Sequence, residues 1–392
     1  MNKHILNNDI QYFINNNLFS DVNSILLKQT SFENVSTKEL VEQIESKNKC
    51  KTKLPTWFNQ ANIYYPNKLN IEQTSSEITA EFKSKLLTGN RIIDLTGGFG
   101  VDCFYFSKHF KEVIHCELNE SLSEIVQHNF EIFNLKNIQC FPTDGLEYLN
   151  SQSMQFDWIY IDPSRRHDSK GKVFMLSDCS PNVPENLELL WKHSKNILVK
   201  TSPLLDISIG LKELQHVKTI HIVAVNNEVK ELLWILEHNY SEALEIETIN
   251  IKSESSEKFK FNLENETIVE AIYSEPLTYL YEPNAAVMKS GGFNSIAKQF
   301  KIHKLHKHSH LYTSDLLIGF PGRAFKIKTI IPYNKKALKA LNIHKANITT
   351  RNFPDSVETI RKKSNIKDGG NDYLFFTTNL RNEKLCLVCK KV

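Results

Sequence analysis

The residues best suited to chemistry follow the ends of apolar segments in the first half of the chain. Asp94 ends the segment RIIDL and precedes a glycine-rich turn, TGGFG, after which a helical pattern begins at Val101. Glycines allow a backbone to approach a ligand closely and to adopt conformations that a side chain forbids. The turn lacks the dinucleotide pattern G-x-G-x-x-G and instead matches D-x-x-x-G-x-G, with Asp94, Gly98 and Gly100 in register and Gly97 as an additional glycine.

Two further acids follow the next two strand-like segments. Glu117 ends VIHCEL, and Asp144 ends FPTD and is followed by Gly145. One acid of this kind is typical of any solvated loop. Three acids at three successive strand ends, beside a glycine turn, indicate one cofactor site, because parallel strands end at a common sheet edge.

A fourth strand-like segment, WIYI, ends in Asp162-Pro163-Ser164-Arg165-Arg166. The Arg pair opens a polar loop that also holds Lys170 and Lys172, and guanidinium groups suit bidentate binding of phosphate. The alternative is a solvated loop with weak surface ion pairs. We expect the Asp162 carboxylate to orient or deprotonate a group of the bound substrate, with Arg165 beside it. Lys200 and Thr201 end the segment ILVKT, and we expect them to point towards the same edge of the sheet.

The elements that position these residues alternate between strand and helix. Residues 1–50 have helical periodicity, with Ser36 or Thr37 placed to cap the third helix, and a proline- and aromatic-rich connector follows. From residue 91 short apolar strands alternate with helices, and TIHIVAVN, KELLWILEH and LEIETINI complete the series. KFKFNL is expected as a hairpin partner at the sheet edge. The pattern predicts an α/β fold with a Rossmann-like, doubly wound, mainly parallel sheet.

The order and spacing of the predicted strands and helices change in the last third of the chain. A small α+β unit with a turn at Gly291-Gly292 precedes a unit of four strands and two helices, the second helix with Asp355 and Glu358 as its capping box. We therefore predict an N-terminal helical region and connector (1–75), a catalytic domain (76–265) and two small α+β domains (266–320 and 321–392).

Composition and charge narrow the function classes. Of the 392 residues 41% are hydrophobic and 24% charged, which is ordinary for a globular protein and excludes disordered and low-complexity classes. Residues 321–392 hold 16 Lys and Arg against 5 Asp and Glu, a net +11, whereas residues 1–320 hold 32 against 40, a net −8. A basic C-terminal module on an acidic body indicates a polyanionic partner, although a lysine-rich solvated surface is the plainer alternative.

Other candidate groups are better explained as structure. The seven scattered cysteines do not form a disulfide framework. Cys179 is the one plausible nucleophile for an alternative, cysteine-based mechanism. His303, His306 and His310 would share a face if their segment were helical, but neither they nor the lone Cys386-x-x-Cys389 pair is expected to bind a metal. The connector contains three aromatic residues, Trp57, Tyr64 and Tyr65. We expect them to pack in the protein rather than to stack on a base.

The glycine turn resembles motif I of class I S-adenosylmethionine-dependent methyltransferases. This resemblance implies that the backbone of residues 96–101, including Thr96, accommodates the methionine part of the cofactor, that Glu117 holds the ribose hydroxyls and that Asp144 lies by the adenine. The DPSRR stretch resembles motif IV, whose acid and backbone carbonyl orient a target amine. Amino-group enzymes often carry Asp-Pro-Pro-aromatic there, and RNA-base enzymes with Asp-Pro-Pro-Arg are more similar to Asp162-Pro163-Ser164-Arg165.

The resemblance extends over most of the chain to a bacterial group of methyltransferases with C-terminal ferredoxin-like and THUMP-like domains. It is carried by LNIEQTSSE, DLTGGFGVD, DPSRR, YEPNAAVMKSG, HLYTS, TTRNFP and GGNDYLFFTT. It implies S-adenosylmethionine as cofactor, no metal, and RNA, with tRNA as one possibility, as substrate. Pro163, Ser164 and Arg166 would then contact the substrate. The alternatives are methylation of a small molecule or protein, and a non-catalytic RNA-binding protein that retains the cofactor fold.

The start of the chain lacks a basic stretch followed by an apolar core, and no run approaches the roughly 20 apolar residues of a membrane span. Together with the free thiols, this leads us to expect a cytoplasmic protein with no membrane partner and no obligate protein partner.

Overall fold

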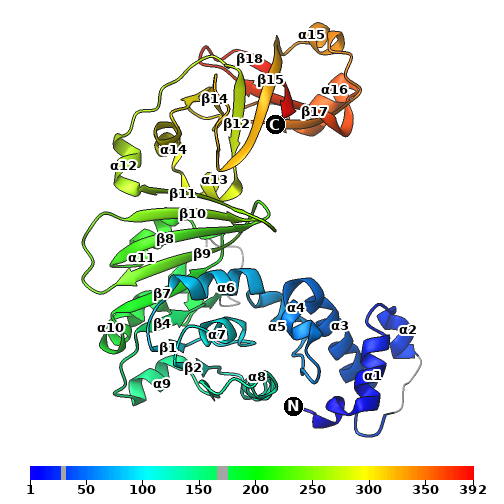
Figure 1. Cartoon of the computed structure of the whole chain (residues 1–392), viewed down its shortest axis with the longest axis vertical. Helices are drawn as coiled ribbons and strands as arrows, with labels where there is room; N and C mark the ends of the chain where they lie inside the picture. Colours follow the sequence, from blue (N-terminus) through cyan, green and yellow to red (C-terminus); the bar gives the residue numbers. More distant parts are fainter. Residues whose placement is uncertain (28–31, 166–174) are drawn as a thin grey trace. The chain divides into compact units, whose positions relative to one another are not determined.

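The computed structural model describes residues 1–27, 32–165 and 175–392, and the chain forms two compact units (Figure 1). The first unit comprises residues 1–217 and 234–240, and the second comprises residues 218–233 and 241–392. Within the described residues no helix is both long and apolar enough to cross a membrane.

The first unit begins with the expected helical region. Ser36 caps the long helix α3 in a full capping box with Glu39, as the sequence predicts. The connector aromatics are buried: Trp57 is 0% exposed and packs on the rings of Phe104 and Phe133. The helices are η1 (Lys3–Leu6), α1 (Asn8–Asn16), α2 (Val22–Leu27), α3 (Thr37–Lys53), α4 (Pro55–Asn59), α5 (Lys68–Gln73) and α6 (Glu77–Leu86).

A parallel sheet in the order β7-β4-β1-β2-β3 forms the centre of this unit. Its central strands are buried almost throughout, which requires cover on both faces. The predicted α/β class with a doubly wound sheet is therefore confirmed. The strands are β1 (Arg91–Asp94), β2 (Glu112–Cys116), β3 (Ile138–Phe141), β4 (Trp158–Ile161) and β7 (Asn196–Thr201).

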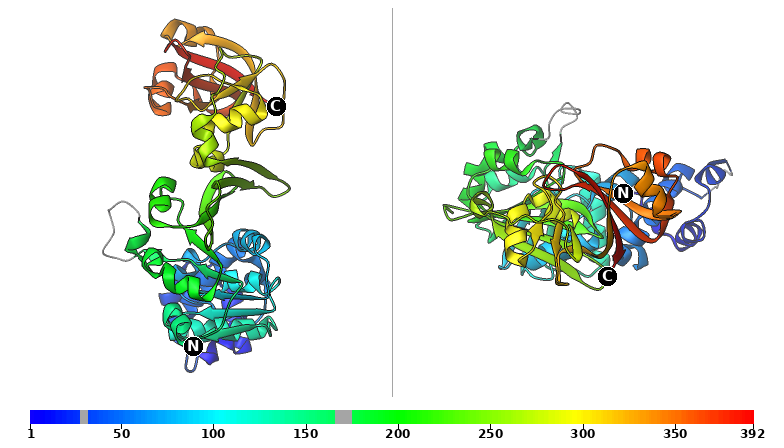
Figure 2. Two further views of the ribbon diagram at one scale, coloured as in Figure 1. Left: turned by 90° about the vertical axis from the view of Figure 1, so that its left-hand side faces the viewer. Right: turned by 90° about the horizontal axis from the view of Figure 1, so that it is seen from above.

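Helices follow the strands of this sheet, as the alternating pattern predicts (Figures 1 and 2). They are α7 (Val101–Phe106), α8 (Glu120–Ile132), α9 (Gly145–Ser151), α10 (Val183–His193) and α11 (Ile207–Glu213). A small antiparallel ribbon of β5 (Ser164–Arg165) and β6 (Cys179–Ser180), with the short helix η3 (Leu176–Asp178), lies in the chain between β4 and α10.

The alternation of strand and helix stops at this point of the chain. KELLWILEH lies within the strand β9 (Glu228–Glu237), which follows β8 (Val217–Val225) without a helix between them and is its neighbour in the sheet order. The reason lies in the turn: Asn226 and Asn227 both have positive φ, 50° and 67°, which is the requirement of a two-residue hairpin turn. The expected hairpin of β10 (Glu245–Ile251) with β11 (Ser256–Asn262) is present.

The second unit contains a seven-stranded sheet in the order β13-β14-β12-β15-β18-β17-β16. Its strands are β12 (Tyr279–Pro283), β13 (His303–Lys304), β14 (Tyr312–Ser314), β15 (Gly322–Pro332), β16 (Lys345–Thr350), β17 (Lys367–Thr378) and β18 (Lys384–Lys391). Its helices are α12 (Leu263–Ile268), α13 (Ala285–Ser290), α14 (Phe293–Phe300), α15 (Lys335–Ala340) and α16 (Val357–Ser364).

The end of α13 and the start of α16 can be compared with the predictions from the sequence. Gly291 ends α13 with φ 76°, which confirms the predicted turn. The capping box at α16 was placed one residue too early: Ser356 caps the helix, while Asp355 pairs with Lys363. The Ser356 hydroxyl accepts the N3 amide at this position, so the neighbouring Asp355 is left to pair with Lys363 in the last turn of the same helix.

Candidate functional site

The acids that the sequence singles out gather at one edge of the sheet. Strand β1 is parallel to β2 and β4, with Asp94 in register with His115 and Tyr160. Asp94 ends β1, while Glu117, Asp144 and Asp162 follow the ends of β2, β3 and β4. Because all four strands run in the same direction, their carboxyl ends, and with them the four acids, border the same edge.

The three glycines of the turn are needed for different reasons. A Cβ on Gly97 would lie 2.2 Å from Nε2 of His115, and one on Gly100 would lie 2.6 Å from Cζ of Phe130. Both positions are closed by packing inside the protein. Gly98 has φ 54°, and a Cβ there would meet nothing closer than 3.8 Å, so its outer side is open to a ligand.

Glu117 lies directly against this open glycine. Its carboxylate accepts hydrogen bonds from the amides of Gly98 (2.9 Å) and Asn119 (2.8 Å), one at each oxygen. A carboxylate has about four acceptor positions, so two remain for hydroxyl donors. Its neighbour Leu118 is 75% exposed and offers apolar surface beside the carboxylate, a feature that sequence reasoning did not single out.

Asp144 and Gly145 have a defined structural role at the same edge. Asp144 caps α9 by accepting hydrogen bonds from the amides of Leu146 (2.8 Å) and Glu147 (3.2 Å). A Cβ on Gly145 would lie 2.5 Å from the carbonyl oxygen of Leu95, so a glycine is required where α9 begins beside the loop after β1.

Asp94 faces inward and holds the turn. Its carboxylate accepts hydrogen bonds from the amide and hydroxyl of Thr96 (2.9 and 3.2 Å) and from the thiol of Cys103 (3.4 Å). Burial raises the pKa of Asp94 to about 7, and the nearby charges of Asp102 and Asp162 act in the same direction.

Asp162 is fixed from two sides. Its amide donates a hydrogen bond to Oγ1 of Thr96 (2.7 Å), which links motif IV to the glycine turn. Lys200, at the end of β7, forms an ion pair with Asp162 through Nζ and Oδ2. The Lys200 side chain is only 12% exposed whereas that of Asp162 is 31% exposed, so the carboxylate faces outward with the lysine behind it.

The motif IV residues that follow Asp162 differ in their exposure. Pro163 is buried, Ser164 is exposed, and Arg165 pairs with Cys179 in the β5–β6 ribbon. Arg166 and the loop lysines, Lys170 and Lys172, lie outside the described residues.

Sequence reasoning missed a buried polar cluster beneath Asp162. The Asp102 carboxylate accepts hydrogen bonds from Ser75 (2.8 Å) and Tyr160 (2.9 Å) and pairs with Nζ of Lys83 at 3.2 Å. Although burial opposes ionisation, the charges of Lys83 and Lys200 and the two hydrogen bonds keep the pKa of Asp102 below its ordinary value. Helical spacing placed Lys83 on α6, but only the tertiary fold brings it to α7 and β4.

His115 is a second residue that the sequence did not single out. Its ring is fully buried under the turn, with Nε2 3.3 Å from the carbonyl oxygen of Gly98. Burial lowers the pKa of His115 to about 4, so the ring is neutral at physiological pH and supports the glycine turn without a charge.

The structure does not support the alternative nucleophile and metal-binding residues considered from the sequence. Cys179 is 0% exposed, which disfavours it as a nucleophile. The segment with the three histidines is not helical: it forms β13 and a turn. Cys386 and Cys389 point into separate apolar clusters on opposite faces of β18. Among the described residues no group of three or more His, Cys, Asp or Glu side chains is placed to hold a metal.

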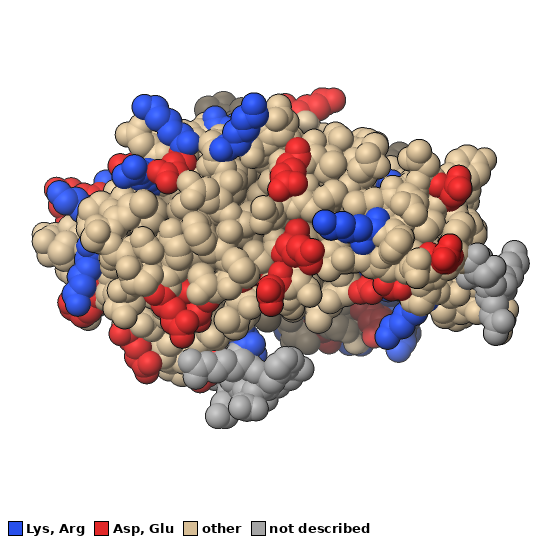
Figure 3. All heavy atoms as spheres, turned by 90° about the horizontal axis from the view of Figure 1, so that it is seen from below, with Lys and Arg blue, Asp and Glu red and all other residues tan. Residues whose placement is uncertain are grey.

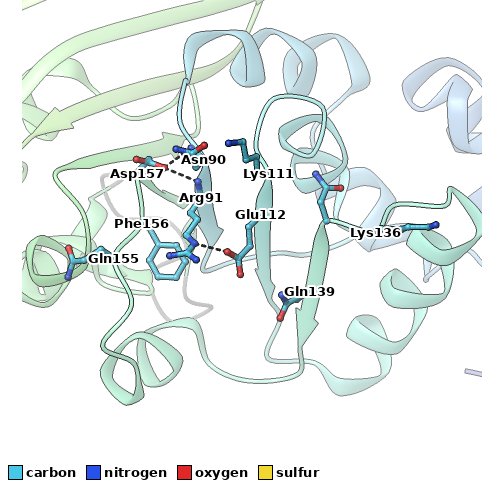
Figure 4. Close-up of a pocket in the computed structure, with 10 residues that line it drawn as sticks. Asn90, Arg91, Lys111, Glu112, Lys136, Gln139, Gln155, Phe156 and Asp157 are labelled. Atoms are coloured by element: carbon cyan, nitrogen blue, oxygen red, sulfur yellow. Dashed lines mark hydrogen bonds and ion pairs between the residues drawn. The ribbon is translucent and has the colours of Figure 1, made fainter.

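A hollow of about 730 Å³ opens at the opposite, amino-terminal edge of the sheet (Figure 4). Among the groups that line it, Arg91 pairs with Glu112, and the Asp157 carboxylate accepts hydrogen bonds from the amides of Asn90 and Arg91. Figure 3 shows one face of the molecule, on which Lys and Arg side chains stand among Asp and Glu. Neither feature displaces the carboxyl edge as the candidate site.

Comparison with known proteins gives the family. A crystal structure of a protein from Porphyromonas gingivalis W83, described as a "putative methyltransferase", is 32% identical, covers 100% of this chain and 98% of its own, and superposes with a TM-score of 0.91. The chain belongs to this methyltransferase family. Residues 89–166 match the RNA cap guanine-N2 methyltransferase family, residues 279–321 a ferredoxin-like domain and residues 322–391 a THUMP-like domain.

Two curated relatives match part of the chain. A tRNA (guanine(26)-N(2))-dimethyltransferase of Methanobrevibacter smithii is 29% identical over 109 residues, which are 27% of this chain and 28% of that protein. Ribosomal RNA small subunit methyltransferase J of Francisella philomiragia is 25% identical over 181 residues, 41% of this chain and 74% of that protein. The chain thus spans under a third of the first relative and about three quarters of the second.

Proposed function

We propose that this protein transfers a methyl group from S-adenosylmethionine to a base of RNA, with tRNA as the first class of RNA to test. The observation that carries the proposal is the junction of Gly98 and Glu117. There an open backbone position lies 2.9 Å from a carboxylate that retains acceptor capacity, at the carboxyl edge of a methyltransferase-family sheet.

The residues of this edge suit the cofactor's chemistry. Glu117 would accept the ribose hydroxyls, Leu118 would contact the adenine, and the backbone of residues 96–100 would hold the methionine part. Asp144 is engaged as a helix cap but keeps one oxygen for a further donor. When bound, the cofactor supplies a methyl group that its sulfonium has already activated.

The protein's own task is to place and prepare the acceptor. Asp162 would accept a hydrogen bond from a target amine and so direct its lone pair, while the ion pair with Lys200 holds the carboxylate in place. Thr96 joins the Asp162 backbone to the cofactor turn, which would set the distance between donor and acceptor. Pro163, Ser164, Arg165 and Arg166 would contact the substrate beside them.

RNA is favoured as substrate by two independent lines of support. The curated relatives are named for tRNA and ribosomal RNA, and the match to RNA cap guanine-N2 methyltransferases covers the cofactor turn and motif IV. The C-terminal module carries a net charge of +11, which suits a polyanion. We place this activity in the cytoplasm.

The test is transfer of tritiated methyl from S-adenosylmethionine to RNA from cells that lack the protein, followed by mass spectrometry of the nucleosides. We expect a methylated base with the wild type and a loss of at least about 100-fold in rate for Asp162→Asn, with cofactor affinity retained. Asp9→Asn, an exposed acid on α1, is the matched control and should retain full activity. Methyl transfer only to protein or to a small molecule, or cofactor binding without any transfer, would contradict the proposal.

A further inference from the structure

The histidine-rich segment that the sequence analysis set aside as a metal site contacts a segment of the C-terminal module in the second unit. The segment 301–310, KIHKLHKHSH, and the segment 349–354, TTRNFP, are joined by a contact of 2.9 Å between Nδ2 of Asn352 and Nδ1 of His306. The same ring nitrogen lies 3.1 Å from the amide of His308. We refer to His306, Lys307, His308, His310, Arg351 and Asn352 as the histidine–arginine cluster.

Two polar atoms of this cluster lack a hydrogen-bond partner among the described residues. Nδ1 of His310 and Nε of Arg351 are buried without a hydrogen bond. The His310 ring is held against Phe293, with the ring centroids 3.6 Å apart and nearly parallel. A neutral imidazole and a guanidinium that are fixed in this way, each with a buried polar atom that has no hydrogen-bond partner, have a cost that a bound hydrogen-bonding group would relieve.

The charge of the cluster is not balanced from within. Arg351 and Arg323 both bind the single buried carboxylate of Glu282, Arg351 at 3.0 Å, so two guanidinium groups share one negative charge. Burial lowers the pKa of His310 to about 4, and the positive charges of Lys304 and Arg351 act in the same direction. The local potential is therefore positive, and Lys307 and His308 are exposed at its surface.

We propose that the histidine–arginine cluster binds a backbone phosphate of the RNA substrate. Arg351 offers planar donors that suit a phosphate oxygen, its side chain is 31% exposed, and the imidazoles of His306 and His308 lie with centroids 5.6 Å apart at the same place. The inference rests on the proposed function, since it names the part of the chain that holds the RNA. A defined phosphate site of this kind differs from a diffuse electrostatic attraction of the RNA to the whole basic module.

The test compares two double variants that each remove exposed side chains from the second unit. Lys307→Gln/His308→Gln alters the cluster without touching Glu282 or the apolar core. Lys258→Gln/Lys260→Gln removes two exposed lysines from β11, which lies in the second unit but outside the basic module, and serves as the control. Binding of fluorescently labelled total tRNA to the full-length protein is measured by polarisation at several salt concentrations, and binding of S-adenosylmethionine is measured by calorimetry to confirm the fold.

We expect the cluster variant to bind tRNA about tenfold more weakly, with a lower salt slope, and the control to change by less than about twofold. Cofactor binding should be unchanged in both. If the wild type binds tRNA and both variants weaken equally or not at all, the cluster is not the phosphate site, while the proposed function stands. If the wild type fails to bind or methylate any RNA, the proposed function and this inference both fail.

Discussion

Two adjacent glycines at the cofactor turn have separable roles. In Gly97→Ala the new methyl would overlap the buried His115 ring, so we expect a loss of about 2–3 kcal/mol of stability, measured by urea unfolding. Gly98→Ala should cost only about 1 kcal/mol, for its positive φ, because its outer side is open. The second variant should nevertheless lose cofactor affinity. Equal stability losses for the two variants would show that the turn is packed differently.

Asp94 gives a pH signature at the same scale. Its pKa is raised to about 7 in the folded protein, so ionisation opposes folding: its contribution is complete below the unfolded pKa near 4 and is lost as pH rises towards 7. In Asp94→Asn this dependence is absent. The difference in melting temperature between wild type and variant should therefore move in favour of the variant between pH 4.5 and pH 8. A constant difference over this range would contradict a buried, proton-holding Asp94.

Residues at strand ends were predictable, and residues joined by tertiary contact were not. Asp94, Glu117, Asp144 and Asp162 follow from the strand pattern alone, because parallel strands must share a carboxyl edge. Lys83, Asp102 and Tyr160 belong to three different elements, and no local pattern indicates that they meet.

At the scale of elements, the buried cluster ties α6 to α7 and β4. Lys83→Met would leave Asp102 as a buried charge without its lysine, and we expect a loss of about 3–5 kcal/mol of stability in urea unfolding. Lys85→Met on the same helix is the control: its partner Glu81 is exposed, so the loss should be below about 1 kcal/mol. Similar losses in both variants would remove the structural role assigned to the cluster.

The types of the elements were predictable from the sequence in segments with long periodicity. They were less predictable where a short turn determines how the chain continues. The strand β9 belongs to a hairpin because Asn226 and Asn227 have positive φ in the turn before it, and the apolar residues of KELLWILEH do not by themselves indicate this turn. The α16 cap moved from Asp355 to Ser356 because either residue type caps a helix and only geometry selects between them.

At the scale of the molecule, the basic C-terminal module is not a separable part. Strand β12, which precedes the predicted domain boundary at residue 321, pairs with β15, which follows it. One apolar cluster also joins the two sides of this boundary: Leu280, Leu305 and Leu311 pack on Phe325, Phe375 and Leu387. A protein truncated to residues 1–320 should expose this cluster, with increased binding of a hydrophobic dye and rapid proteolysis after residue 270. Full protection of that region would contradict the shared core. Charge substitutions are therefore a better probe of RNA binding than deletion.

The central claim is that the Gly98–Glu117 junction binds S-adenosylmethionine, and calorimetric titration of this cofactor tests it most directly. We predict saturable binding of one molecule per chain to the wild type, at least about tenfold weaker binding to Glu117→Ala, and unchanged binding to Glu188→Ala, an exposed acid on α10. A wild type that releases no heat of binding, or a Glu117→Ala variant that binds as tightly as the wild type, would contradict the claim.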